Sequence, residues 1–216
     1  MSKKVYLKYL AKILKRKLKM KQEIERKYGV KNLPNNLKIE SIWNIEQVNI
    51  YRDINTHIRI RKIETTYRKN HTNYIYTIKT KGDVKDNNYD IGKKYEIENE
   101  ISKEEYDELI KNKISKIIQK TRIVIPIENN LKVEMDVYYD YLEGFLTAEV
   151  EFENEEQAKK FIKPEWLGEE LGYKELSNRK LTEMTREEWQ GKVTKEFIEN
   201  NRKIIKELKE KYNISY

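Results

Sequence analysis

Several strand-like segments of this chain carry charged side chains on one face and apolar side chains on the other. Residues 22–28 read QEIERKY. A strand repeats every two residues, so Glu23, Glu25 and Lys27 would share one face there. A charged face cannot form a hydrophobic core, and its usual place is in contact with water. That interpretation changes if other strands repeat the arrangement.

The alternation recurs along most of the chain. Turn residues separate many of the segments, among them LPNN at 33–36, KGDVKDNN at 81–88, ENN at 128–130 and LEG at 142–144. Alternating or β-branched-rich stretches predict eight strands, at roughly 22–28, 44–51, 57–63, 74–80, 93–100, 117–125, 131–139 and 146–153. Capping residues and apolar spacing predict helices at about 102–114, 154–162 and 194–211. Ser102 and Glu105 would form a capping box at the first helix, and Asn154 would begin the second.

The charges on these strands separate by sign. A face in contact with water usually mixes Lys and Glu with Thr and Ser, whereas separation by sign indicates ligand binding. The acidic pairs are Glu96/Glu98, Glu134/Asp136 and Glu149/Glu151, and the basic pairs are Arg59/Arg61 and Lys120/Arg122.

An eight-stranded antiparallel barrel has an interior just wide enough for side chains or for one small ligand. If the charged faces point inward, the lumen contains both cations and carboxylates. The cations are Lys27, Arg59, Arg61, Lys79, Lys120 and Arg122, and the carboxylates are Glu23, Glu25, Glu96, Glu98, Glu134, Asp136, Glu149 and Glu151. Adjacent carboxylates repel one another unless a hard divalent cation binds them. The expected ligand is therefore a polyanion with a bound metal ion.

The predicted fold class is α+β, with an eight-stranded antiparallel β-barrel that forms a tunnel with a charged lumen and flanking helices that cover its apolar outside. The 216 residues suit one domain. The chain has no cysteine, which excludes disulfides and zinc–thiolate sites, and only 2 histidines. No apolar run approaches the ~20 residues of a membrane span and no secretory segment is visible, so a cytoplasmic protein is expected.

The net charge of +8 comes from the N-terminal segment. Residues 1–21 contain nine basic residues and no acidic one, so the rest of the chain carries a net charge of −1. Apolar residues recur there at helical spacing, which predicts a basic amphipathic helix. Such a helix could bind an anionic membrane surface or a nucleic acid. Alternatively, it packs on the domain with its lysine face in water. The expected parts are this helix, a tunnel domain at 22–185 and a helical extension at 186–216.

Short motifs follow one another in a fixed order. Glu23-Ile24-Glu25-Arg26-Lys27 has the pattern ExExK. The later motifs are IEQ at 45–47, RIR at 59–61, TIK at 77–79, YEI at 95–97, KTR at 120–122, EMD at 134–136 and AEVEF at 148–152, followed by PEWLGEE at 164–170 and then by Asn178 and Leu181. In this order they resemble the CYTH superfamily, the triphosphate tunnel metalloenzymes, and in particular its small bacterial inorganic triphosphatases. The resemblance covers about residues 22–183.

The resemblance implies a metal-dependent triphosphatase that acts on tripolyphosphate or a nucleoside triphosphate. The implied catalytic residues are Glu23, Glu25, Lys27 and Lys120. The implied phosphate ligands are Lys27, Arg59, Arg61, Lys79, Lys120 and Arg122. Glu96 and Glu98 would orient these cations. The implied ligands for two Mg²⁺ or Mn²⁺ ions are Glu23, Glu25, Glu134, Asp136, Glu149 and Glu151.

Two alternatives remain open at this point. The same lumen residues would serve a class IV-type adenylyl cyclase that makes cyclic AMP from ATP, or a module that binds polyphosphate or a 5′-triphosphate without turning it over. Many bacterial relatives have Gly-Tyr after IEQ, whereas this chain has Val48-Asn49. That departure puts substrate positioning in question. A homodimer also remains open.

The basic segment yields a prediction of its own. Deleting residues 1–20 is expected to leave tripolyphosphate turnover within a few-fold and to weaken binding to nucleic acid or anionic vesicles. The physical reason is that charges on the outside are screened beyond the ~8 Å Debye length at physiological salt. A truncated protein that stays folded, keeps its oligomeric state and loses turnover would place the helix in the catalytic apparatus.

Overall fold

The computed structural model describes residues 20–67, 70–81, 92–172 and 176–215. The expected basic helix lies almost entirely in residues 1–19, outside the described residues. Most of the KGDVKDNN turn at 81–88 lies outside them as well.

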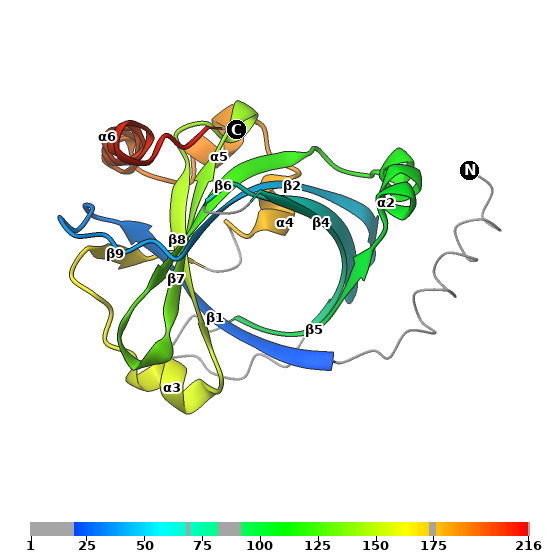
Figure 1. The fold of residues 1–216 in the computed structure, drawn as a ribbon, viewed down its shortest axis with the longest axis horizontal. Coiled ribbons are helices and arrows are strands. Elements are labelled where there is room, and N and C mark those ends of the chain that lie inside the picture. The colour runs from blue at the N-terminus through cyan, green and yellow to red at the C-terminus, as the bar shows by residue number, and fades with distance from the viewer. Residues whose placement is uncertain (1–19, 68–69, 82–91, 173–175, 216) are drawn as a thin grey trace.

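Eight antiparallel strands form a closed barrel (Figure 1). Around the ring, β5 pairs with β4, then β3, β2, β6, β7, β8 and β1, and β1 pairs back onto β5. The strands are β1 (Met20–Val30), β2 (Ser41–Arg52), β3 (Thr56–Thr65), β4 (His71–Lys81), β5 (Gly92–Ile101), β6 (Ile118–Pro126), β7 (Lys132–Tyr138) and β8 (Leu146–Phe152). The predicted fold class and all eight strands are confirmed.

Helices flank the barrel. They are α2 (Lys103–Leu109), α3 (Glu155–Lys160), α4 (Asn178–Leu181), α5 (Arg186–Gln190) and α6 (Lys195–Tyr212). Short 3-10 turns occupy Ile110–Asn112, Glu128–Asn130 and Asp140–Leu142. The capping box between Ser102 and Glu105 is present, and Asn154 caps α3 as expected. The helix predicted at 102–114 is shorter, because α2 tightens into a 3-10 turn after Leu109 and ends at Asn112.

The sequence patterns did not predict three short elements of the structure. They are α4, α5 and a ninth strand, β9 (Leu167–Glu170), which pairs with the end of β1 outside the ring. Each spans four or five residues. That length is too short for a periodic apolar pattern.

The apolar faces of the strands point outward and are covered. One cluster joins the outer faces of β1, β7 and β8 to Ile204, Ile205 and Leu208 of α6. A second joins β2, β3 and β4 to Tyr106 and Leu109 of α2. The barrel thus has its hydrophobic core outside the ring of strands, which leaves the inside to charged residues. Among the described residues, no helix combines the length and apolar character that crossing a membrane requires.

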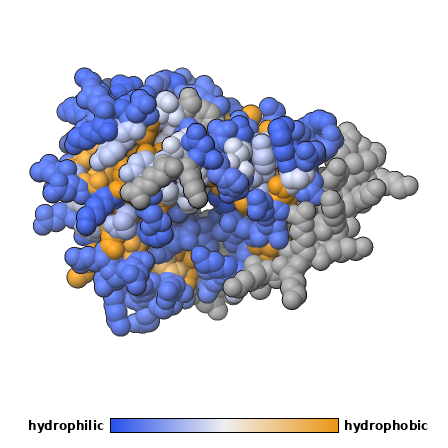
Figure 2. Space-filling view, viewed as in Figure 1, coloured by the Kyte–Doolittle hydropathy of each residue, from blue (hydrophilic) through white to orange (hydrophobic). Residues whose placement is uncertain are grey.

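A third cluster closes one end of the barrel. Trp189 of α5 and Leu181 of α4 are both fully buried there, with Tyr138 and Phe145. The indole Nε1 of Trp189 donates to the carbonyl of Tyr141 at 2.9 Å. These contacts hold α4 across the end of the ring. In the same view, a space-filling picture shows a hollow bordered by hydrophilic residues (Figure 2).

Candidate active site

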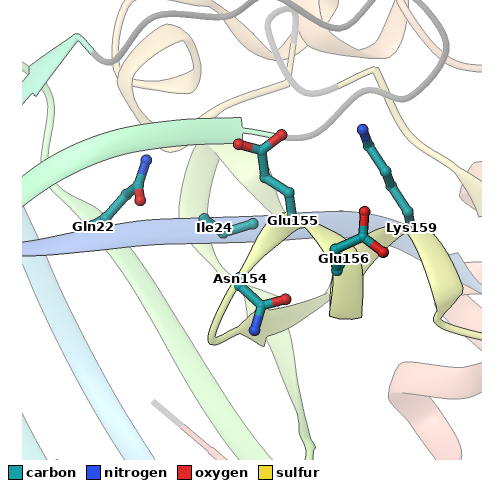
Figure 3. A pocket seen from close by; sticks show the side chains of 6 residues that line it. All are labelled: Gln22, Ile24, Asn154, Glu155, Glu156 and Lys159. Atoms are coloured by element: carbon teal, nitrogen blue, oxygen red, sulfur yellow. The ribbon is translucent and has the colours of Figure 1, made fainter.

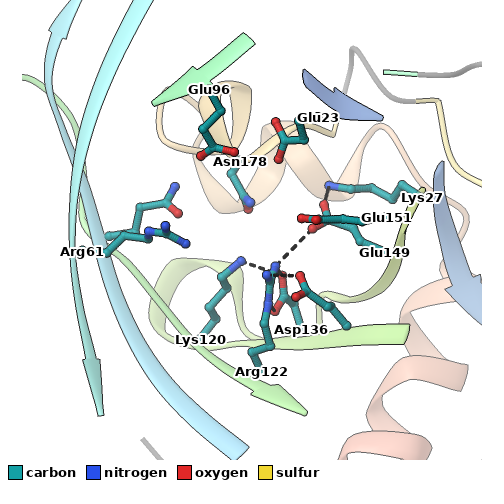
Figure 4. Close-up of polar contacts among 12 residues, drawn as sticks. Glu23, Lys27, Arg61, Glu96, Lys120, Arg122, Asp136, Glu149, Glu151 and Asn178 are labelled. Atoms are coloured by element: carbon teal, nitrogen blue, oxygen red, sulfur yellow. Dashed lines mark hydrogen bonds and ion pairs between the residues drawn. The ribbon is translucent and has the colours of Figure 1, made fainter. Parts of the chain in front are cut away.

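The barrel encloses a cavity of about 860 Å³. Its wall contains every charged residue predicted for the lumen except Asp136, which lies fully buried behind Lys120 and Arg122. Figure 4 shows these side chains converging from opposite walls. The structure therefore brings together all of the predicted site residues.

Cations of β3 and β4 face carboxylates of β5 and β1. Arg59 Nη2 lies 3.1 Å from Glu96 Oε1. Lys79 Nζ lies 2.7 Å from Glu23 and 3.5 Å from Glu96. The β4–β5 register explains the second contact, because it places Lys79 directly opposite Glu96.

Arg122 is the centre of the other wall. Its Nε and Nη2 bind the two carboxylate oxygens of Asp136 at 2.7 Å each, a bidentate pair. Its Nη2 also lies 3.1 Å from Glu149, and Nη1 pairs with Glu134. Lys120 Nζ approaches the same Asp136 at 2.5 Å. One guanidinium thus organises three carboxylates.

Burial and neighbouring charges shift the pKa values of this wall. Burial raises the pKa of Glu134 to about 7, and the charges of Glu151, Asp136 and Glu149 add to the effect against the opposing influence of Arg122. Burial and the Arg122 guanidinium lower the pKa of Lys120 to about 8. Arg122 and the neighbouring lysines instead lower the pKa values of Asp136 and Glu149 despite their burial, so Glu134 differs from these two carboxylates.

The opposite wall is charged at neutral pH. Burial and Arg59 lower the pKa of Arg61 to about 10, which still leaves it cationic. Burial alone would raise the pKa of Glu98, but Arg61 and Arg59 outweigh it and lower that pKa to about 2. This wall therefore presents fixed cations to an anion.

At two places in the barrel, carboxylates of neighbouring strands lie directly opposite each other. Glu25 of β1 faces Glu151 of β8, and Glu134 of β7 faces Glu149 of β8. Like charges in this arrangement are destabilising, and carboxylate oxygens are the ligands that Mg²⁺ prefers. Within the described residues, no group of three or more acidic or histidine side chains already lies in position to hold a metal ion. The donor chemistry and the repelling pairs nevertheless fit a divalent cation.

The end closed by α4 adds polar groups that the sequence patterns did not identify. Ser177, Asn178, Arg179 and Lys180 line the cavity there. Tyr138 donates its hydroxyl to Asn178 Oδ1 at 2.7 Å. Asn178 belongs to a motif noted in the sequence, but no periodic pattern marks the other three.

Asn49 stands where many bacterial relatives were expected to have tyrosine. Its Oδ1 lies 2.6 Å from Nε2 of His57, and its Nδ2 donates to Thr182 Oγ1 at 3.2 Å. Asn49 therefore ties the barrel to the residue that follows α4. In this chain, residue 49 therefore helps to attach α4 to the barrel at its closed end.

Gln47 is a further residue that sequence reasoning missed. Its side chain is 1% exposed and lines the cavity. Arg59 Nη1 donates to Oε1 at 3.5 Å, while Nε2 has no hydrogen-bond partner among the described residues. The wall thus offers an uncharged donor next to the cations. Its position in the IEQ motif was the signal that could have identified it.

A smaller hollow of about 390 Å³ lies outside the barrel, where β1 passes the start of α3 (Figure 3). Its lining includes Gln22, Glu155 and Lys159. These side chains come from two neighbouring surface segments and do not converge on one point in Figure 3. The hollow has no arrangement comparable to that of the lumen.

Comparison with known proteins agrees with this architecture. The CYTH domain model matches residues 21–186. An inorganic triphosphatase of Nitrosomonas europaea is 29% identical over 109 residues, which cover 50% of this chain and 67% of that protein. The crystal structure of the hypothetical protein NE1496 is 25% identical, with a TM-score of 0.51 over 76% of this chain and 99% of that one. A crystal structure of the inorganic triphosphatase NE1496 is 26% identical, with a TM-score of 0.49 over 74% and 93% of the two chains.

Proposed function

This chain belongs to the CYTH family, and we propose that it is a divalent-metal-dependent hydrolase of inorganic triphosphate or of another compound with an exposed triphosphate. The observation that carries the proposal is a closed barrel whose cavity is lined by cations on one side and by opposed carboxylate pairs on another. Similarity to an inorganic triphosphatase supports it.

The cations would bind the phosphate oxygens. Arg59, Arg61 and Arg122 present planar guanidiniums that suit bidentate contacts to phosphate, and the lysines act as point charges. The remaining members of this set are Lys27, Lys79 and Lys120. Ion pairs with Glu96, Glu98, Glu149 and Asp136 hold these side chains in place before any ligand enters. Such preorganised charge is the largest contribution to many phosphoryl transfers.

The carboxylates would hold two Mg²⁺ or Mn²⁺ ions, the number that the family resemblance implies. The ligands would be Glu23, Glu25, Glu134, Asp136, Glu149 and Glu151. A divalent ion, when bound, would supply a nucleophilic water at neutral pH and shield the phosphate charge. Glu25 and Glu151, which lie directly opposite each other on β1 and β8, would be among the residues that hold this ion. Attack on the terminal phosphorus breaks its bond to the bridging oxygen, and Arg61, Arg59 and Lys79 would neutralise the charge that develops on the departing diphosphate.

The test is a screen of substrates and products. Tripolyphosphate, ATP and thiamine triphosphate are incubated with the full chain and Mg²⁺ or Mn²⁺ at neutral to alkaline pH, and released phosphate is measured. We expect release that requires the divalent ion and stops when a chelator is added. Folded protein that releases phosphate from none of them would refute the proposal.

The same screen separates the alternatives. Formation of cyclic AMP and pyrophosphate from ATP would indicate a cyclase. Tight tripolyphosphate binding in a calorimeter without any turnover would indicate a binding module.

A further inference from the structure

We propose that the side-chain amide of Gln47 donates a hydrogen bond to a phosphate oxygen of the substrate, beside Arg59 and Arg61. The inference rests on the proposed function, because the acceptor is an oxygen of a triphosphate in the same cavity. It adds a neutral binding residue to a set of phosphate ligands that are otherwise cations. The described residues of β2 that line the cavity are Trp43 and Gln47, so Gln47 is the polar group with which this strand can reach a ligand.

The strand register places Gln47 next to both arginines of β3. Gln47 lies directly opposite Arg61 in the β2–β3 pair, and such neighbours have Cβ atoms about 5 Å apart. Arg59 Nη1 lies 3.5 Å from Gln47 Oε1. Figure 4 shows Arg61 projecting into the cavity from this wall. A phosphate group bound by these two guanidiniums would therefore lie beside the Gln47 amide.

The orientation of the amide follows from hydrogen-bond chemistry. A guanidinium only donates, so the oxygen of Gln47 must face Arg59. The NH₂ group is then turned away from Arg59. Its Nε2 is buried and has no hydrogen-bond partner among the described residues, and the whole side chain is 1% exposed. A buried donor without a partner is destabilising, so this NH₂ needs an acceptor that enters the cavity.

The two arginines have unused donors of the same kind. Arg59 Nε and Arg61 Nε are also buried without a hydrogen-bond partner in the part of the chain that the structure describes. Their outer nitrogens are paired, Arg59 Nη2 with Glu96 and Arg61 Nη2 with Glu98. Three neighbouring donors without an acceptor match a ligand group that carries several acceptor oxygens, and a phosphate group is one.

A neutral donor suits this wall better than a third cation. Burial and Arg59 already lower the pKa of Arg61 to about 10, which shows that positive charge is costly here. An amide adds a hydrogen bond to the phosphate without adding to this repulsion. Its carbonyl oxygen also gives Arg59 an acceptor that does not compete with the substrate for negative charge.

Calorimetry with imidotriphosphate, a non-hydrolysable ligand, measures the contribution of the amide. The ligand is titrated into the full chain in the presence of Mg²⁺. Gln47→Met keeps a similar side-chain volume and removes the amide, and we expect it to weaken binding by about 10-fold or more, since the lost hydrogen bond is to a charged group. Gln119→Met makes the same chemical change at a half-buried residue of β6 that does not line the cavity, and should leave the affinity unchanged.

A double-mutant cycle separates direct donation from an effect through Arg59. In the Arg59→Met background, Gln47→Met should still weaken binding several-fold if the amide contacts the phosphate, and should have no further effect if it only orients Arg59. A second measurement does not require the Arg59 variant to fold. The side-chain amide signal of Gln47 in a ¹⁵N–¹H NMR spectrum, assigned by its loss in Gln47→Met, should shift when imidotriphosphate is added to the wild-type protein, while that of Gln119 should not.

Several results would overturn the inference. It is wrong if Gln47→Met binds imidotriphosphate as tightly as the wild-type protein, if its effect disappears in the Arg59→Met background, or if the Gln47 amide signal does not move. It is also wrong if the folded wild-type protein does not bind imidotriphosphate. Phosphate release by the wild-type protein, measured separately, leaves the proposed hydrolase standing in each of these cases. Binding that depends on Gln47 without release of phosphate from any triphosphate would support the hydrogen bond and refute the hydrolase.

Discussion

Replacing Arg122 with leucine is expected to lower tripolyphosphate turnover at least ~100-fold and to reduce the free energy of unfolding by about 3–5 kcal/mol. Arg122 binds both oxygens of Asp136, which is fully buried, and contacts Glu134 and Glu149. Removing the guanidinium leaves buried carboxylates without their main partner, and the energetic cost of an uncompensated buried charge is large. Equilibrium unfolding in urea and a phosphate-release assay measure the two effects.

A surface ion pair provides the matched control. Lys132 Nζ lies 2.7 Å from Glu40, and the two side chains are 51% and 46% exposed. Lys132→Leu should therefore change the free energy of unfolding by no more than about 1 kcal/mol and leave turnover intact. A similarly small change in Arg122→Leu would show that the buried network does not stabilise the barrel.

Replacing Glu25 with glutamine is expected to lower turnover on the order of 100-fold or more while sparing the binding of tripolyphosphate. The substitution keeps the shape of the side chain and removes one of the two opposed charges of the Glu25/Glu151 pair. Affinity for a divalent ion should fall, since a neutral amide is a weaker ligand than a carboxylate. Calorimetry with tripolyphosphate in a chelator, a Mn²⁺ titration and a phosphate-release assay measure the three quantities separately.

Glu40→Gln makes the same chemical change at an exposed site outside the barrel and should leave all three quantities unchanged. Turnover by Glu25→Gln within ten-fold of the wild-type value would remove Glu25 from the set of metal ligands. Loss of turnover together with loss of metal-free tripolyphosphate binding would indicate a role in folding the cavity instead.

Local patterns were sufficient for the eight barrel strands and for their inward-facing charged residues. The two-residue repeat depends on neighbouring residues alone, so all eight strands, and the charged face of every strand except β2, could be identified from the chain. The same holds for the caps at Ser102 and Asn154, because a cap is made within one turn. Short elements such as α4, α5 and β9 were missed because they lack a full period of the pattern.

Pairings between distant strands were decided by the tertiary structure. β1 closes the barrel by pairing with β5, about seventy residues later in the chain, and no local signal specifies that register. The same kind of register brings Glu25 opposite Glu151 and Trp43 opposite Arg122. Which carboxylate each cation contacts follows from these pairings, as for Arg122 and Asp136. The sequence by itself thus determined which charged side chains of the strands face the cavity, because that property repeats locally. The partners they have there depend on long-range register, which only the folded barrel decides.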